Sequence, residues 1–273
     1  MAQIVSAREF DLTELWDEAV MSHSTVILLC WVVLAVGVVI FFTLKSAQWK
    51  RQLRMIPGLK AIEEAIGRST ELGKPMVFTT GWGGDIQRPT TLAALNLLKF
   101  VAAKAAAYGT RIIFPTHDPV IAETAREILR TAYAEQGHGD LFRDDDVVFV
   151  SPTQFGYAAG VDGIITRSQP GALFLLGTFE GEALILAETG NMTGALQIAG
   201  TDSTIQLSFF IVACDYTLIG EELYTASAYL SDDKRIKASM LAQDALRLLL
   251  LAILIILPIA ALLGFDWHRS LMP

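Results

Sequence analysis

An uncharged apolar run of 20 residues, Thr25–Leu44, constrains this chain more than any other stretch. At a rise of about 1.5 Å per residue, a helix of this length crosses the roughly 30 Å hydrocarbon core of a bilayer. A second uncharged apolar run, Leu248–Phe265, lies close to the C-terminus and is also long enough to span a membrane. The two runs predict a globular segment held between two transmembrane helices.

Charged residues around these runs predict the orientation of the chain. The segment before Thr25 is acidic, whereas the segment after Leu44 is basic and contains no acid as far as Lys60. Basic residues also precede the second run. Because basic flanking segments stay in the cytoplasm, we expect residues 46–247 to be cytoplasmic and both termini to lie outside. The basic residues are Lys45, Lys50, Arg51, Arg54 and Lys60 before the globular segment, and Lys234, Arg235, Lys237 and Arg247 after it.

Composition argues against several classes of function. The net charge is −8 and no basic patch is interleaved with aromatic residues, so we expect no nucleic-acid partner. Two cysteines, Cys30 in the first span and Cys214 in the globular part, do not form a disulfide framework. The four histidines are too scattered for a histidine-rich metal centre. We predict no metal and no cofactor, and the lipid bilayer is the first expected partner.

These features divide the chain into seven segments. The globular part is the longest of them, and linkers join it to the two spans. The predicted division is an amphipathic segment (1–24), a transmembrane helix (25–44), a basic linker (45–58), a cytoplasmic α/β domain (59–231), a charged linker (232–247), a second transmembrane helix (248–265) and a short polar tail (266–273).

Between the spans, short apolar runs alternate with helical patterns. Strands that are apolar throughout and alternate with helices indicate a mostly parallel sheet covered on both faces. We therefore predict a Rossmann-like layered α/β domain. The expected strands are Met76–Phe78, Arg111–Phe114, Asp146–Val150, Ala172–Leu176 and Leu196–Ala199, and the expected helices include Thr91–Tyr108, a helix from Asp118-Pro119 to Glu135, and one around Gly156–Thr166.

Two of these assignments leave alternatives open. The helix Thr91–Tyr108 carries charge only at Lys99 and Lys104, so it belongs either in the core or at a subunit interface. The segment Thr204–Leu230 is either a strand followed by a helix or a helix bent near Asp215, and we favour the bent helix.

In an open parallel sheet, ligands bind beyond the carboxyl ends of the strands. The loops expected there begin at Thr79, Pro115, Ser151 and Gly177, and they are rich in hydroxyl groups and glycine. The first loop, TTGWGGD, is the best candidate for an anion cradle, because glycines let backbone N–H groups approach a ligand. It matches neither dinucleotide nor P-loop spacing. The candidate ligand-binding residues are Thr79, Thr80, Gly81, Gly83, Gly84, Asp85, Thr116, His117 and Asp118.

Each candidate also has a structural alternative. A glycine loop of this kind is commonly a tight turn. His117 is a candidate acid or base, while Asp118 also fits the N-cap of the following helix. Four later carboxylates are candidates for a catalytic pair, but turns and caps are commoner roles for them, so we assign no catalytic residue. These carboxylates are Glu188, Asp202, Asp215 and Glu221.

Four long phrases carry a family resemblance: GKPMVFTTG (73–81), FPTHDP (114–119), AETGNMTGALQIAGTDS (187–203) and ACDYTLIGEELYTASAYLS (213–231). Through them the chain resembles an uncharacterised family of two-span prokaryotic membrane proteins, defined as a domain of unknown function. The resemblance covers about Leu59–Ser231 and the flanking spans. It implies the inner or plasma membrane of a prokaryote and implies no activity, cofactor or catalytic residue.

Three functions are compatible with these observations. The first is a membrane-anchored scaffold subunit whose cytoplasmic α/β domain self-associates into a homo-oligomer, with other membrane-complex subunits as further partners. The alternative is a domain that binds or senses a small anionic or nucleotide-like molecule at the post-strand loops. A hydrolytic enzyme using His117 or the later carboxylates is the least favoured, since no recognised catalytic motif occurs.

Overall fold

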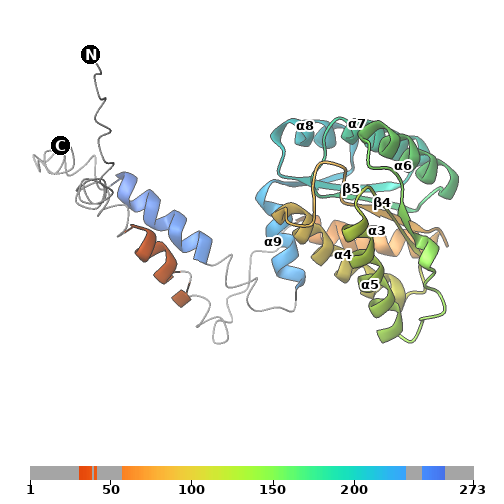
Figure 1. Cartoon of the computed structure of the whole chain (residues 1–273), viewed down its shortest axis with the longest axis horizontal. Coiled ribbons are helices and arrows are strands. Elements are labelled where there is room, and N and C mark those ends of the chain that lie inside the picture. Colours follow the sequence, from red (N-terminus) through yellow and green to blue (C-terminus); the bar gives the residue numbers. More distant parts are fainter. Residues whose placement is uncertain (1–30, 39, 42–56, 232–241, 256–273) are drawn as a thin grey trace, which may run out of the picture. The chain divides into compact units, whose positions relative to one another are not determined.

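The structure is a computed structural model that describes residues 31–38, 40–41, 57–231 and 242–255 (Figure 1). The chain divides into two compact units, Met1–Lys50 with Lys234–Pro273, and Arg51–Asp233. In the first unit, residues 31–38, 40–41 and 242–255 are helical. The rest of the two predicted spans lies outside the described residues, as do the amphipathic segment, most of both linkers and the polar tail.

The second unit is built on a six-stranded sheet in the order β3-β2-β1-β4-β5-β6. Every pair of neighbouring strands is parallel, which confirms the predicted α/β fold with a parallel sheet. Four of the strands are buried along their whole length, as expected for a sheet covered on both faces. The strands are β1 (Met76–Thr79), β2 (Ile112–Thr116), β3 (Val147–Phe149), β4 (Ala172–Leu176), β5 (Leu196–Thr201) and β6 (Tyr216–Ile219).

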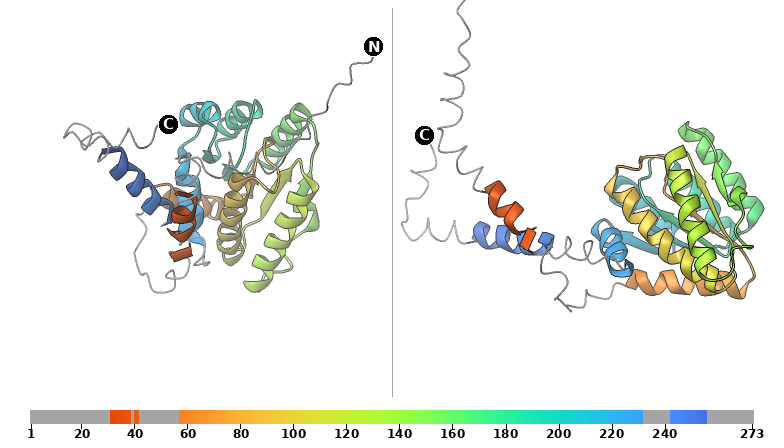
Figure 2. Two further views of the ribbon diagram at one scale, coloured as in Figure 1. Left: turned by 60° about the vertical axis from the view of Figure 1, so that its left-hand side comes forward. Right: turned by 60° about the horizontal axis from the view of Figure 1, so that its bottom comes forward.

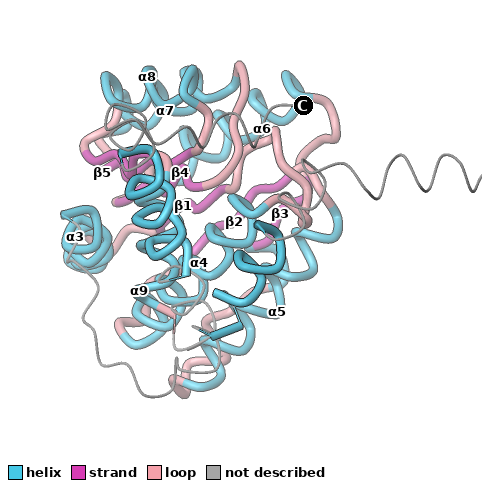
Figure 3. Tube along the Cα trace, turned by 90° about the vertical axis from the view of Figure 1, so that its left-hand side faces the viewer, coloured by secondary structure: helices cyan, strands magenta, loops and turns pink. Residues whose placement is uncertain are grey.

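Helices cover the sheet in two layers (Figure 2). On one face lie α3 (Pro57–Glu71), α4 (Pro89–Ala107), α5 (Pro119–Glu135) and α9 (Glu221–Leu230). On the other lie α6 (Gln154–Ser168), α7 (Glu182–Thr193) and α8 (Thr204–Ala213), as Figure 3 shows. Alternate strand residues enter the two layers, so Met76 and Phe78 face α4 whereas Val77 belongs to the core beneath α6 and α7.

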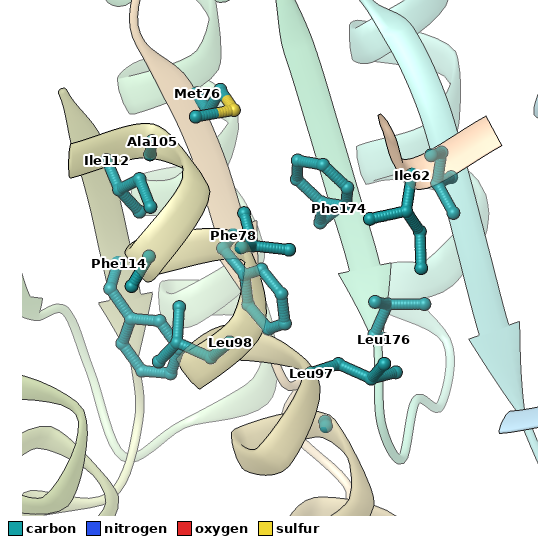
Figure 4. Close-up of a cluster of buried hydrophobic side chains, with 14 of the residues drawn as sticks. Ile62, Met76, Phe78, Leu97, Leu98, Ala105, Ile112, Phe114, Phe174 and Leu176 are labelled. Carbon is teal, nitrogen blue, oxygen red and sulfur yellow. The ribbon is translucent and has the colours of Figure 1, made fainter. Parts of the chain in front are cut away.

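A row of phenylalanines forms the centre of the first core (Figure 4). Phe78 on β1 stacks on Phe114 of β2 and Phe174 of β4, with ring centroids 6.0 Å and 5.6 Å apart. Leu97 and Leu98 of α4 pack into the same cluster. These aromatic contacts join three adjacent strands to one helix, and burial of such side chains is the main source of stability in a domain of this kind.

Among the described residues, one helix is long and apolar enough to cross a membrane, and this helix is α4, with a mean hydropathy of 1.2. It lies in the core of the α/β unit: 61% of the apolar stretch is buried, and the helix packs against α5 and α9. The structure therefore decides between the two alternatives for Thr91–Tyr108 in favour of a core helix.

The segment Thr204–Leu230 contains a strand that the sequence analysis missed. Instead of one bent helix, α8 and α9 are separated by β6. Asp215, the expected bend, fastens this strand to its neighbour, because its carboxylate accepts a hydrogen bond of 2.8 Å from the Gln197 N–H at the start of β5. Helix α7, which joins β4 to β5, was also not predicted.

Candidate functional site

The candidate site lies at the carboxyl edge of the sheet, the edge at which the strands end, between β1 and β4. From β1 the chain moves outward to β2 and β3, and it then returns to the centre of the sheet as β4. This reversal of direction is the topological switch point, where ligands bind in open parallel sheets. Thr79 and Thr116 are the last residues of β1 and β2, and the other predicted site residues follow these strands.

The loops after β1 and β4 are bonded to each other. Gly83 N–H donates to the Thr178 carbonyl, and Thr178 N–H donates to the Thr80 carbonyl, each over 3.0 Å. Gly81 and Gly177 have φ values of +78° and +148°, and a Cβ on either would collide with a carbonyl oxygen of the opposite loop. Only glycine fits at these two positions, so these glycines serve the contact between the loops.

A buried glutamate that the sequence analysis did not single out holds these loops in place. Glu182, at the start of α7, is 0% exposed. Its Oε1 accepts hydrogen bonds from Trp82 N–H (2.9 Å) and Glu180 N–H (3.2 Å), and its Oε2 accepts one from the Gln154 side chain (3.1 Å). Such bonds offset the cost of burying a carboxylate. Glu182 therefore connects the β1 loop, the β4 loop and α6.

His117 is half-buried beside the β1 loop. Its Nδ1–H donates to the Gly81 carbonyl over 3.2 Å, which leaves Nε2 as the ring acceptor of the neutral side chain. The ring packs against Trp82 and Tyr157, with centroids 6.0 Å and 5.9 Å away. Burial lowers the pKa of His117, opposed by Asp118, by the bond to Gly81 and by Glu182. The imidazole is therefore mostly neutral near pH 7.

Several predicted site residues have structural partners. Asp118 Oδ1 accepts from the N–H groups of Val120 (2.6 Å) and Ile121 (3.0 Å), and so caps α5. Asp85 Oδ1 accepts two N–H bonds of 3.1 Å in the turn before α4. These bonds support the structural alternative for each carboxylate.

Thr79 belongs to a different buried network. Its hydroxyl donates to the Pro115 carbonyl over 3.1 Å and accepts from the hydroxyl of Tyr157, which is wholly buried. Burial raises the pKa of Tyr157 well above its ordinary value, so this phenol stays protonated. The pair joins β1 to β2 and α6 beneath His117.

Three buried hydroxyl groups at this edge have no hydrogen-bond partner among the described residues: those of Thr80, Thr91 and Thr178. The exposed fractions of these residues are 0%, 0% and 7%. Two of the oxygens converge on one glycine, because a Cβ on Gly84 would lie 2.7 Å from Thr91 Oγ1 and 3.0 Å from Thr178 Oγ1. A buried hydroxyl without a partner costs roughly 1–3 kcal/mol, so three of them at one edge of the sheet, two of them beside the same glycine, require an explanation.

The N-terminus of α4 adjoins these hydroxyls. Thr91 lies in the first turn of α4, whose N-cap residue, Arg88, makes no side-chain hydrogen bond to the helix N–H groups. In α5, by contrast, Asp118 fills this role. An uncapped helix N-terminus presents N–H donors and the positive end of the helix dipole. The carboxyl edge thus combines a helix N-terminus that its N-cap side chain does not cap with buried hydroxyls.

A further polar cluster lies beside α4, on the β5 side. Asp202, the residue after β5, accepts hydrogen bonds from Thr90 (3.0 Å) and from the Tyr224 hydroxyl of α9 (3.2 Å). Sequence analysis named Asp202 only as one of four scattered carboxylates, because nothing in the sequence places it next to the start of α4. No group of three or more metal-ligating side chains occurs in the described part of the chain.

A hollow of about 280 Å³ lies at the opposite, amino edge of the sheet, lined in part by Thr70, Lys74, Tyr108 and Arg111. The buried polar groups around it are paired. Thr70 and Thr110 share a hydrogen bond of 2.7 Å, and Arg111 pairs with buried Asp146 through a bond of 2.6 Å. We therefore place the candidate site at the carboxyl edge, where three buried hydroxyls have no partner among the described residues.

Comparisons with known proteins give a family and no function. No curated protein and no solved structure matches the chain at a significant level. The family model DUF6754, a domain of unknown function, matches residues 17–272, which is most of the chain and includes the whole α/β unit. This match confirms the resemblance to a family without an assigned activity. The chain belongs to the DUF6754 family.

Proposed function

We propose that this protein is a membrane-anchored binding domain that holds a small phosphate-bearing anion at the carboxyl edge, between β1 and β4. The observation that carries the proposal is the set of three buried hydroxyls without partners, on Thr80, Thr91 and Thr178. Hydroxyl and helix N–H groups are the usual donors to phosphate oxygens, and the helix dipole favours negative charge. A bound anion accounts for hydroxyls that are otherwise costly to bury.

The part of the β1 loop beside these hydroxyls consists of two glycines, which favours access of a ligand. Gly83 and Gly84 have no side chains, and Gly84 lies directly beside the Thr91 and Thr178 hydroxyls. Displacement of this pair breaks the bond from Gly83 N–H to the Thr178 carbonyl, but the two glycines have no side chains that must be moved. Glu182 meanwhile holds Trp82 and the β4 loop, so the rest of the site keeps its shape.

Binding of inorganic phosphate to the full chain in mild detergent, measured by isothermal titration calorimetry, tests this function. Thr91→Val and Thr178→Val keep the side-chain shape but remove a donor, and each should weaken phosphate binding about tenfold or more. Ser168→Ala is the matched control, because it removes a buried, unpartnered hydroxyl from the other end of α6. Absence of phosphate binding, or equal affinity in all variants, contradicts the proposal.

The proposal includes two membrane anchors, Thr25–Leu44 and Leu248–Phe265, with the domain in the cytoplasm of a prokaryote. Their apolar length and the basic residues next to the domain support it. Gln136→Cys introduces a thiol at an exposed site at the end of α5. In intact cells this thiol should react only with a membrane-permeant reagent. Reaction with an impermeant reagent contradicts the orientation, and extraction of the chain by alkaline carbonate contradicts the anchors.

A second candidate function, self-association as a scaffold, is favoured by an apolar surface on α7 and α8, two helices that pack side by side. From Ser203 to Cys214 the chain has no charged residue, and only Phe210 of α8 is buried. Contiguous exposed apolar surface is typical of an interface, and we propose a second copy of the chain as its partner. The exposed residues are Leu184, Ile185, Met192, Ile205, Ile211 and Val212.

The mass of the detergent-solubilised particle tests this second function. Val212→Glu places a charge on a side chain that is 87% exposed, and it should convert an oligomer into a monomer. Val120→Glu, on α5 at the other face of the sheet, is the control and should leave the mass unchanged. A monomeric wild-type chain contradicts self-association.

A further inference from the structure

Asp202 offers an unused acceptor next to the proposed anion site. It is exposed and directly follows β5. Its Oδ2 accepts both hydrogen bonds from Thr90 and Tyr224, at 3.0 Å and 3.2 Å, while no described group donates to Oδ1. Thr90 is the neighbour of Thr91 in the first turn of α4. The carboxylate is therefore held in a fixed orientation beside the helix N-terminus with one oxygen available.

The threonine hydroxyls at the start of α4 and the Asp202 carboxylate suit different chemical groups on a ligand. The Thr91 and Thr178 hydroxyls and the start of α4 are donors, which suit phosphate oxygens. Asp202 only accepts, so it selects a hydroxyl or amine on the ligand. Burial raises the pKa of the Tyr224 phenol, and the positive charge of Arg88 partly opposes this rise, so Arg88 adds a positive charge near the cluster. A single ligand that satisfies both halves carries a phosphate and neighbouring hydroxyl groups.

The side of the switch point toward β2 and β3 is occupied by the protein itself. Trp82 reaches from the β1 loop to the loop after β3, where its Nε1–H donates to the Pro152 carbonyl over 3.0 Å. The His117 ring packs against the indole. A dinucleotide in a doubly wound fold lies across both sides of the switch point. This arrangement leaves the β4 and β5 side, where Thr178 and Asp202 lie, for the ligand.

We infer that the ligand is a phosphate ester of a polyol, either a sugar phosphate or the ribose phosphate of a mononucleotide, with its phosphate at Thr91 and Thr178 and a hydroxyl on Asp202. The inference rests on the proposed anion-binding function. It adds the class of ligand and assigns Asp202 as the residue that distinguishes a polyol phosphate from phosphate alone.

Calorimetry on the full chain in detergent, with inorganic phosphate, ribose 5-phosphate and NAD as probes, tests the inference. Ribose 5-phosphate should bind at least about tenfold more tightly than phosphate, as expected for one added hydrogen bond to a carboxylate. NAD should bind no more tightly than phosphate. Asp202→Asn keeps an oxygen for Thr90 and Tyr224 but removes the charge, so it should abolish most of the advantage of ribose 5-phosphate without weakening the binding of phosphate, because the lost charge repels an anion.

The outcomes separate the two proposals. Phosphate binding without any advantage for ribose 5-phosphate, or an advantage that survives Asp202→Asn, overturns the inference and leaves the anion site intact. Failure of both phosphate and ribose 5-phosphate to bind overturns the anion site as well. Thr178→Val is the companion variant, because it should weaken both ligands by a similar factor, whereas Asp202→Asn should weaken only the polyol phosphate.

Discussion

Buried polar groups at the two ends of the parallel strands differ in whether they have hydrogen-bond partners. At the amino edge most of these groups are paired within the protein: the Ser69 hydroxyl donates to the Lys74 carbonyl over 2.8 Å, and Thr70 and Thr110 bond to each other. At the carboxyl edge, Thr91 and Thr178 have no partner among the described residues. Among the described residues, buried hydroxyls without a partner are therefore more numerous at the carboxyl edge, where Thr80, Thr91 and Thr178 lie, than at the amino edge, where Ser168 ends α6.

Helix ends repeat this contrast within the carboxyl edge itself. Helix α5 follows β2 and is capped by Asp118, while α4 follows β1 at the switch point and has no side-chain cap. A cap contributes roughly 1 kcal/mol, so its absence at the centre of the sheet is a cost. The N-cap residues of α6, α7, α8 and α9 likewise make no side-chain cap, so the unpartnered hydroxyls of Thr91 and Thr178, and not the missing cap, distinguish the start of α4.

Substitution of Glu182 has the largest expected effect on stability, because this buried carboxylate at the carboxyl edge accepts hydrogen bonds at both of its oxygens. In Glu182→Gln, the side chain loses its charge and one acceptor oxygen, and its NH₂ is accommodated only if the Gln154 amide turns its oxygen toward it. We expect a loss of about 3 kcal/mol in the free energy of unfolding, measured with urea on the solubilised chain. Glu180→Gln, at an exposed position, should change this free energy by less than about 0.5 kcal/mol. Similar values for the two variants contradict the anchoring role.

Asp146 is the corresponding charge at the amino edge. It is 2% exposed and accepts a hydrogen bond of 2.6 Å from Arg111 Nε. Because the Arg111 side chain is 44% exposed, solvent screens the pair, and we expect Asp146→Asn to cost about 2 kcal/mol in urea unfolding. Asp144→Asn, in the same 3₁₀ turn but 71% exposed, is the control and should cost less than about 0.5 kcal/mol. An equal loss of unfolding free energy in both variants contradicts the expected difference between the buried and the exposed carboxylate.

Two threonines allow the contrast between the edges to be tested with one type of substitution. Thr70→Val leaves the buried Thr110 hydroxyl without its partner and should lower the free energy of unfolding by about 1 kcal/mol. Thr178→Val removes a hydroxyl that has no partner, so in the absence of ligand it should raise that free energy by about 1 kcal/mol. Opposite signs in thermal or urea unfolding support the comparison, and equal signs contradict it.

The smallest effect is the dependence of stability on pH that His117 contributes. Burial lowers its pKa in the folded chain, so below the unfolded value of about 6.5 the unfolded state binds a proton that the folded state excludes. The contribution of His117 is complete above that pH and is lost as the pH falls. His117→Asn retains a donor for Gly81 but does not titrate, so its Tm should fall less than that of the wild type between pH 7.5 and pH 5.5. Parallel Tm profiles contradict this prediction.

Much of the α/β unit was predictable because its signals are local. The apolar runs at Met76 and Ala172 mark buried strands, and Asp118-Pro119 marks a helix start. Strand β6 was missed because it is a short edge strand whose four residues include two exposed ones, so it shows no buried run. Helix α7 was missed because Thr189 and Gly190 interrupt a pattern that is apolar on several sides.

The position of the site followed from the fold class, since the loops after β1 and β4 meet at the switch point of the observed sheet. Its chemistry did not follow. The carboxylates of Asp85 and Asp118 support a turn and a helix cap, whereas Glu182 and Asp202 enter the candidate site from later elements of the chain. No spacing rule connects these residues, because their proximity arises from the crossing of the chain between β1 and β4.

The sequence by itself determined the two long apolar runs, the parallel α/β pattern and the glycine-rich loop, because hydropathy and backbone freedom are properties of neighbouring residues. The tertiary structure decided which apolar helix is internal and which polar groups have partners. Helices α4 and α8 are both almost free of charge, yet α4 lies between other helices on the sheet and α8 lies near its edge. Burial and hydrogen bonding depend on what surrounds a residue in space, and only the fold supplies those surroundings.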